Sequence, residues 1–208
     1  MNSFPRVATL LVLLSARPLA FAASAVDIAV GGSITPDACQ VALSDEGTVD
    51  HKKIPAASLK PEEFTLLAPH VLELAILCSQ PMLFALVGID NRADSSLAPD
   101  VLYGLGTNVH APGERLGSVA LSYRDTIGDS QPMQALGSND SGETWAPQTN
   151  AYPKQYMGFA LPGDRQPDFI RQFSTQLRID TAINLSHALT LDQEVPLDGS
   201  IVLDLRYL

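Results

Sequence analysis

Apolar and polar residues alternate along much of this chain, in short runs that glycine and proline interrupt. Alternate side chains of an extended strand point to the same face, so this pattern predicts β-strands with one buried face. The 14 Gly and 15 Pro residues divide the pattern into short elements. The predicted strands cover residues 26–34, 39–43, 71–78, 82–89, 101–105, 118–123, 156–161, 173–183 and 200–207.

The order of these elements predicts an all-β fold. Only residues 59–67, around Pro61-Glu62-Glu63, have the composition of a short helix. No internal repeat or linker separates the strands into groups. Eight or nine short strands in a chain of this length favour a single β-sandwich over a closed barrel.

The predicted strands at the two ends of the chain have the most regular alternation. Chain ends usually fray and are polar, so apolar alternation there indicates that both ends are buried against something. Each could be an edge strand of its own sandwich, or it could pair with another chain. The residues concerned are Val26, Ile28, Val30, Gly32 and Ile34 in the first strand, and Val195, Leu197, Gly199, Ile201, Leu203, Leu205 and Tyr207 in the last.

The N-terminus is typical of an export signal. Arg6 precedes an apolar run over residues 7–16, and small residues suited to cleavage follow. The run is too short for a transmembrane helix, which needs about 20 residues. We therefore expect an exported chain that does not span the membrane, with cleavage after Ala22 or Ala25. An N-terminal core helix is the alternative interpretation.

Composition narrows the functional classes. Hydrophobic residues make up 46% of the chain, enough to form a core. The 13 Lys and Arg face 23 Asp and Glu, for a net charge of −10. Nucleic-acid binding relies on Lys and Arg that neutralise phosphates, and it is excluded here.

Export also changes the interpretation of the two cysteines, Cys39 and Cys78. Exported proteins can form disulfides, so a bridge is expected in preference to two free thiols. Its 39-residue loop would contribute about 4 kcal/mol in the chain-entropy model. The four histidines lack the spacing of metal ligands, so no metal site and no cofactor are predicted.

Several short motifs resemble a known family. Residues 32–41 (GSITPDACQV) are similar to the G-x-[VI]-x4-C-x-V segment of chaperone–usher pilin subunits, and the penultimate Tyr207 is similar to their C-terminal strand. The chain resembles still more a group of uncharacterised fimbrial-like proteins of proteobacteria. That resemblance rests on Gly47-Thr48-Val49-Asp50, Asp90-Asn91-Arg92, Tyr103-Gly104-Leu105-Gly106 and the closing residues 199–208.

The resemblance implies an immunoglobulin-like, pilin-type sandwich that lacks its final strand. A periplasmic chaperone, and then the donor strand of a neighbouring pilin subunit, would fill the vacant place by β-strand addition. An outer-membrane usher would be a further partner. By this resemblance the donor strand is Val26, Ile28, Val30, Gly32 and Ile34. The chaperone-binding residues are Ile201, Leu203, Leu205 and Tyr207.

A search for catalytic motifs gives little. No nucleophile elbow, zinc-protease motif or phosphate-binding loop is present, so we expect no enzyme. Residues 138–145 (SNDSGETW) match the S-x-D-x-G-x-T-W Asp-box of sialidase propellers. A single copy cannot form a propeller. We interpret it as a hairpin turn above a buried or half-buried Trp145, in preference to a sugar-binding site.

Together these features predict a secreted fimbrial subunit at the periplasm and cell surface, assembled by donor-strand exchange, with adhesion as a candidate role. Its parts would be a signal peptide (1–22), an N-terminal extension (23–37) and a pilin-like domain (38–208). The alternative is a free-standing periplasmic or surface β-sandwich that binds carbohydrate or protein. An exported hydrolase is the least favoured class.

Overall fold

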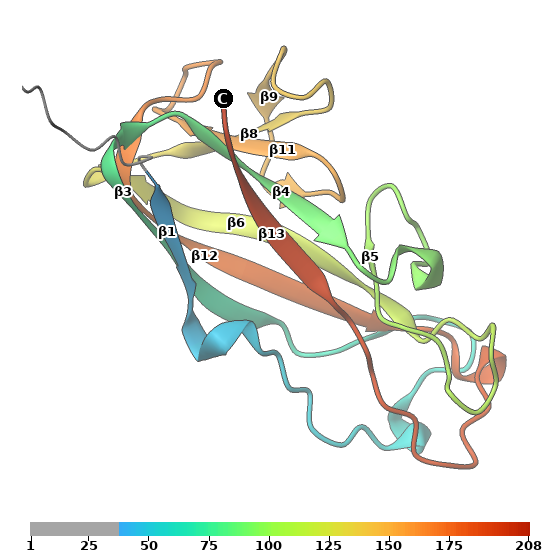
Figure 1. Ribbon diagram of the computed structural model, residues 1–208. Coiled ribbons are helices and arrows are strands. Elements are labelled where there is room, and N and C mark those ends of the chain that lie inside the picture. Colours follow the sequence, from blue (N-terminus) through green and yellow to red (C-terminus); the bar gives the residue numbers. More distant parts are fainter. Residues whose placement is uncertain (1–37) are drawn as a thin grey trace, which may run out of the picture. The chain divides into compact units, whose positions relative to one another are not determined.

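The computed structural model describes residues 38–208, which form two antiparallel β-sheets packed as a sandwich (Figure 1). The predicted all-β sandwich is therefore confirmed. The first sheet has the order β1 (Cys39–Leu43), β3 (His70–Met82), β12 (Ile170–Ile183), β6 (Gly117–Gly128) and β10 (Asn150–Ala151). Three short strands extend it: β2 (Thr65–Leu66) on β12, and β5 (Tyr103–Gly104) and β7 (Gln131–Pro132) on β6.

The second sheet packs against the first. Its order is β13 (Ile201–Tyr207), β4 (Phe84–Asp90), β11 (Tyr156–Ala160), β8 (Gln134–Ser138) and β9 (Ala146–Pro147). Within residues 38–208 the helical elements are short 3-10 turns: η1 (Ser44–Gly47), η2 (Ala56–Ser58), η3 (Ala93–Ser95) and η4 (Ser186–Ala188).

The main core lies between the sheets and is centred on aromatic rings. Phe159 of β11 stacks against Phe173 of β12, with ring centroids 4.1 Å apart. Tyr123 of β6 meets Phe159 edge-on at 5.3 Å. Phe84 of β4 contacts Phe173 in the same way at 6.0 Å. These contacts join strands of both sheets, as expected for alternating strands whose apolar faces are turned inward.

Two expectations about the elements need correction. The helix expected over residues 59–67 is absent: this stretch contains bends and β2. Pro61 and the short apolar pattern let the segment lie extended against β12, where Thr65 and Leu66 pair with Ile183 and Ala182. The strand expected over 101–105 is only the two residues of β5. β8 was not predicted, because its five residues are nearly all buried and do not alternate.

Candidate functional site

The outer edge of β13 is unpaired within the described residues. β13 pairs only with β4. The Ser200 carbonyl accepts a hydrogen bond from the Asn91 amide, 3.0 Å away. The Leu208 amide donates to the Leu83 carbonyl at 3.1 Å. Even-numbered residues therefore face β4, because main-chain groups alternate in direction along a strand. The N–H and C=O groups that face the open edge belong to Ile201, Leu203, Leu205 and Tyr207.

The edge of β1 shows the same arrangement. β1 pairs only with β3 among the described strands. The Cys39 amide points away from β3 and donates to the Tyr207 hydroxyl oxygen at 2.9 Å. By alternation, the main-chain groups of Val41 and Leu43 point the same way.

Val41 shows that this flank is open. It lies opposite Ile76 in the pairing with β3, so both side chains are on the inner face. Ile76 is 2% exposed, whereas Val41 is 42% exposed. An inward valine with this exposure is not covered on its outer side by any of residues 38–208.

The two edges border a groove of about 720 Å³. Figure 1 shows β1 (blue) and β13 (red) along the same side of the sandwich. The groove continues past both strands, between residues 47–59 and 189–199. Its floor is aliphatic and comes from both sheets and the connecting segments: Leu43, Val49, Leu59, Leu72, Leu105, Leu116, Val119, Leu121, Leu177, Ile179, Ile183, Leu189, Leu197, Ile201 and Leu203.

Polar residues gather at the end of the groove away from the disulfide. The His51 and His70 rings meet edge-on with centroids 4.7 Å apart. His51 Nε2 and Thr181 Oγ1 share a hydrogen bond of 2.8 Å. Partial burial lowers the pKa of His51, and the charge on His70 lowers it further, while the charge on Asp50 opposes both. Of these four residues, all except His70 line the groove.

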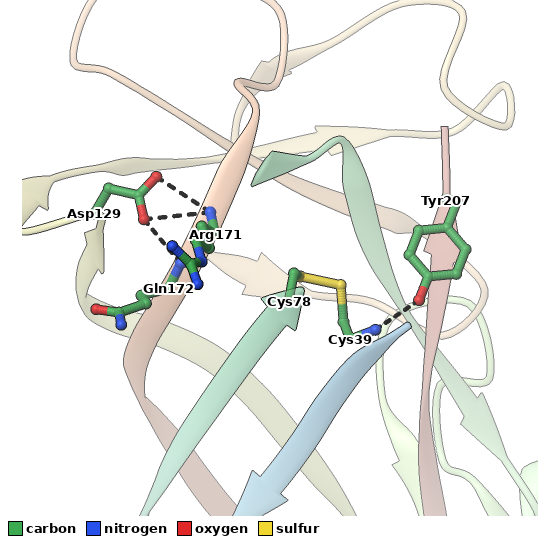
Figure 2. Close-up of a disulfide and its surroundings, with 6 residues drawn as sticks. All are labelled: Cys39, Cys78, Asp129, Arg171, Gln172 and Tyr207. Atoms are coloured by element: carbon green, nitrogen blue, oxygen red, sulfur yellow. Dashed lines mark hydrogen bonds between the residues drawn. A yellow bond between two sulfur atoms is a disulfide. The ribbon is translucent and has the colours of Figure 1, made fainter. Parts of the chain in front are cut away.

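The disulfide lies at the start of β1, beside Tyr207 of β13, whereas Leu43 at the end of β1 lines the groove (Figure 2). Cys39 and Cys78 are bonded with an S–S distance of 2.00 Å, which confirms the predicted bridge. It fixes the first residue of β1 to β3, and four further paired positions hold the rest of β1 against that strand. Cys78 is buried in the core, so the bridge anchors an edge strand to the interior.

Three of the motifs that carry the family resemblance meet at the start of β13. The Asp90 carboxylate accepts a hydrogen bond from the Gly104 amide at 2.7 Å. A Cβ on Gly104 would lie 2.0 Å from the Arg92 carbonyl oxygen, so no side chain fits there. Arg92 in turn forms an ion pair of 2.8 Å with Asp198. These contacts position the segment that leads into the groove wall.

The Asp-box forms the turn between β8 and β9. The Asp140 carboxylate accepts hydrogen bonds from the Ser138 hydroxyl (2.6 Å) and from the Thr144 amide (2.9 Å) and hydroxyl. These bonds, Ser138 first, hold the pKa of Asp140 far below its usual value. Trp145 is 8% exposed, and its Nε1–H donates to the Gly142 carbonyl at 3.0 Å. The buried ring agrees with the hairpin interpretation and leaves no stacking surface for a sugar.

The structure places the predicted site residues as follows. Ile201, Leu203, Leu205 and Tyr207, the predicted chaperone-binding residues, all lie on the open strand β13. The predicted donor residues Val26, Ile28, Val30, Gly32 and Ile34 lie outside the described residues. The groove wall formed by residues 47–59 was not predicted, because apolar and polar residues do not alternate regularly in this segment. The apolar residues Leu189, Leu191, Val195 and Leu197 on the opposite wall were a usable signal, and only the last two were noted.

No group of three or more His, Cys, Asp or Glu side chains among residues 38–208 could hold a metal ion. None of the helices described there is long and apolar enough to cross a membrane.

Comparison with known proteins gives two matches. Residues 28–109 match the model of a family described as "Protein of unknown function (DUF1120)". The chain is also similar to Protein GltF of Escherichia coli (strain K12). That similarity is 25% identity over an alignment of 239 positions, covering 91% of this chain and 92% of GltF.

Proposed function

We propose that this protein is an exported, pilin-like subunit whose groove accepts a β-strand from another protein chain. The observation that carries the proposal is the pair of unpaired edges, β1 and β13, on either side of an aliphatic groove. An added strand would satisfy main-chain groups on both edges and cover the apolar floor. This is the physical basis of recognition by β-strand addition.

The type of ligand follows from the lining. A carbohydrate site needs convergent polar groups, whereas most polar side chains that line this groove pair with one another: Asp50 with Lys52, Lys53 with Glu194, and His51 with Thr181. An extended peptide with alternating apolar side chains matches both the floor and the free main-chain groups. Each side chain that it fully buries would contribute roughly 1.5–3 kcal/mol.

Assembly would then proceed by exchange. A periplasmic chaperone would supply the first strand, and an outer-membrane usher would replace it with the segment Val26, Ile28, Val30, Gly32 and Ile34 of a neighbouring subunit. Such head-to-tail contact does not close on itself, so it yields a filament at the cell surface. The role is structural, in a surface filament, and not enzymatic.

The test compares two neighbouring glycines of the proposed donor segment. Gly32 lies on its apolar face, and Gly31 on the opposite face, because successive residues of a strand alternate. Gly32→Asn should leave the chaperone-bound subunit folded but block its insertion into another groove. Gly31→Asn is the matched control and should still assemble. The measurements are thermal melting of the purified chaperone complex and heat-resistant oligomer ladders from the cell surface.

Two results would contradict the proposal. One is the absence of wild-type ladders when the cognate chaperone and usher are present. The other is a Gly32→Asn variant that lowers the melting temperature of the monomer itself. That result would place the segment in its own sheet, as in a free-standing binding module.

A further inference from the structure

Tyr207 joins β13 to β1 beyond the groove, which these two strands line with Leu43, Ile201 and Leu203. Its side chain lies on the same face of β13 as Leu203 and Leu205, yet the hydroxyl reaches across to β1 and accepts the Cys39 amide hydrogen bond (Figure 2). The residue is 48% exposed, so it spans the two edges at the surface and is not part of the packed core. The bond joins the two edges between which a strand would enter.

Both partners of this bond are held in place. Cys39 is bonded to the buried Cys78 of β3. On the other side, the Leu208 amide is bonded to Leu83 of the chain segment before β4. The Leu208 side chain also reaches the Asp-box turn, where Cδ2 lies 3.4 Å from the position a Cβ on Gly142 would take. The position of Tyr207 is therefore fixed from both sheets.

The alternation of apolar residues in an incoming strand does not by itself fix the register in which it pairs with β13. A slip of one residue would turn the apolar face of an incoming strand outward, so burial prevents it. A slip of two residues would return an apolar residue to each position, and alternation alone does not prevent it. Ile201, Leu203 and Leu205 are similar in size and would not distinguish these registers.

We propose that Tyr207 is the end stop that sets the register of the strand in the groove. Its hydroxyl already satisfies the Cys39 amide, the first groove-facing group of β1, and its ring occupies the path beyond. An incoming strand pairs along Ile201, Leu203 and Leu205 and ends there. Tyr207 is thus a positioning residue, and this role rests on the strand-accepting function proposed above.

The experiment measures how affinity depends on strand length. The probes are synthetic peptides of residues 26–34 (VDIAVGGSI) and versions extended by two residues, one apolar, at either end. The protein is the full mature chain carrying Gly32→Asn, so that its own segment does not compete. Wild-type Tyr207 is compared with Tyr207→Ala and with Tyr207→Phe, which loses only the hydroxyl.

Extension toward Tyr207 should not improve the Kd of the tyrosine protein by more than about twofold. The same extension should improve binding to Tyr207→Ala about tenfold, because an additional apolar side chain and main-chain bonds can form. Tyr207→Phe should gain at least about threefold, because its ring is no longer tied to Cys39. Extension at the other end should change all three proteins equally, and the difference between the ends identifies the strand direction.

The outcomes separate the two proposals. A general loss of stability in a variant would weaken all peptides alike and leave the length dependence unchanged. If the tyrosine protein gains as much as Tyr207→Ala from extension at each end, the end stop is wrong. If no peptide binds any of the three proteins, the strand-accepting function itself fails.

Discussion

The two edges of the second sheet differ in how well they are covered. At one edge, β8 and β9 are joined by the Asp-box turn, and Trp145 covers the outer face against Ala85, Leu136 and Ala160. At the other edge, β13 has no outer neighbour among residues 38–208, and Ile201, Leu203 and Leu205 are only partly buried. One edge is complete within the chain, and the other leaves apolar side chains and main-chain groups without a partner strand.

The difference shows what alternation does and does not determine. The inner faces of β4 and β13 are both apolar, yet Leu86 is 0% exposed while its paired neighbour Leu205 remains partly exposed. The cause is the number of adjacent strands, since in the described part of the chain β4 has two and β13 has one. An added strand that covers these exposed apolar side chains would gain the free energy of their burial.

The disulfide should have the largest effect, because it holds the short edge strand of the open flank. Cys39→Ala together with Cys78→Ala should lower the free energy of unfolding by about 4 kcal/mol, the chain-entropy value for a loop of this size. Denaturant unfolding of the mature chain measures it. The reduced wild-type protein is the control and should lose a similar amount. A loss below about 1 kcal/mol would show that β1 is held by packing instead.

Paired truncations compare the two flanks directly. Leu86→Ala should cost roughly 2–5 kcal/mol, as expected for a fully buried leucine. Val41→Ala should cost much less, below about 1 kcal/mol, because solvent already reaches that side chain. Unfolding in denaturant gives both values for the chain without a bound strand.

The unfolding free-energy costs of Val41→Ala and Leu86→Ala can also be measured with the 26–34 peptide bound. The cost of Val41→Ala should then rise, and that of Leu86→Ala should stay unchanged. Equal costs of the two truncations in the free chain would mean that the β1 flank is as well packed as the covered one.

Gly88 links the covered core to the open strand, since it pairs with Leu203. A Cβ at this position would lie 2.0 Å from the hydroxyl oxygen of the buried Tyr103. Gly88→Ala should therefore cost roughly 1–3 kcal/mol through overpacking. Adding Tyr103→Phe should recover part of this, because the nearest atom is then the ring Cζ at 2.8 Å.

Gly128→Ala is the matched control for Gly88→Ala in thermal or denaturant unfolding. Its Cβ would meet the flexible Met133 side chain at 3.1 Å, which can move aside. A Gly88→Ala variant no less stable than Gly128→Ala would argue against a rigid Tyr103 beneath the groove wall.

The sequence carried enough information for the fold class but not for the open flank. Long strands such as β3 and β12 alternate over many residues, and the export signal predicted from the sequence made the Cys39–Cys78 bridge predictable. β8 could not be predicted, because both of its faces are covered and a buried run has no period. The groove depends on which strand lacks a neighbour, a tertiary property. The wall formed by residues 47–59 is irregular, and its only sequence signal was the Gly47-Thr48-Val49-Asp50 motif.

The smallest expected effect is a pH dependence at the polar end of the groove. Because burial and His70 lower the pKa of His51 in the folded state, the unfolded chain takes up a proton more readily. The stability contributed by neutral His51 is present above its ordinary pKa of 6.5 and is lost as the pH falls below that value. His51→Gln, which can keep a hydrogen bond to Thr181, should flatten the stability curve between pH 8 and pH 5.

A second variant separates the two causes of the lowered pKa of His51, which are its burial and the charge on His70. His70→Gln removes the neighbouring charge but not the burial of His51, so it should flatten the curve only in part. Asp50, the remaining charged group that acts on His51, raises its pKa, and Asp50→Asn should steepen the dependence. Thermal melting across the pH range measures all three variants against the wild type. Parallel curves for His51→Gln and wild type would mean that His51 titrates alike in the folded and unfolded chain.

A bound strand should bury His51 further and lower its pKa more. The pH dependence of wild-type stability should therefore be stronger with the 26–34 peptide bound. This pH response would then distinguish the occupied flank from the open one.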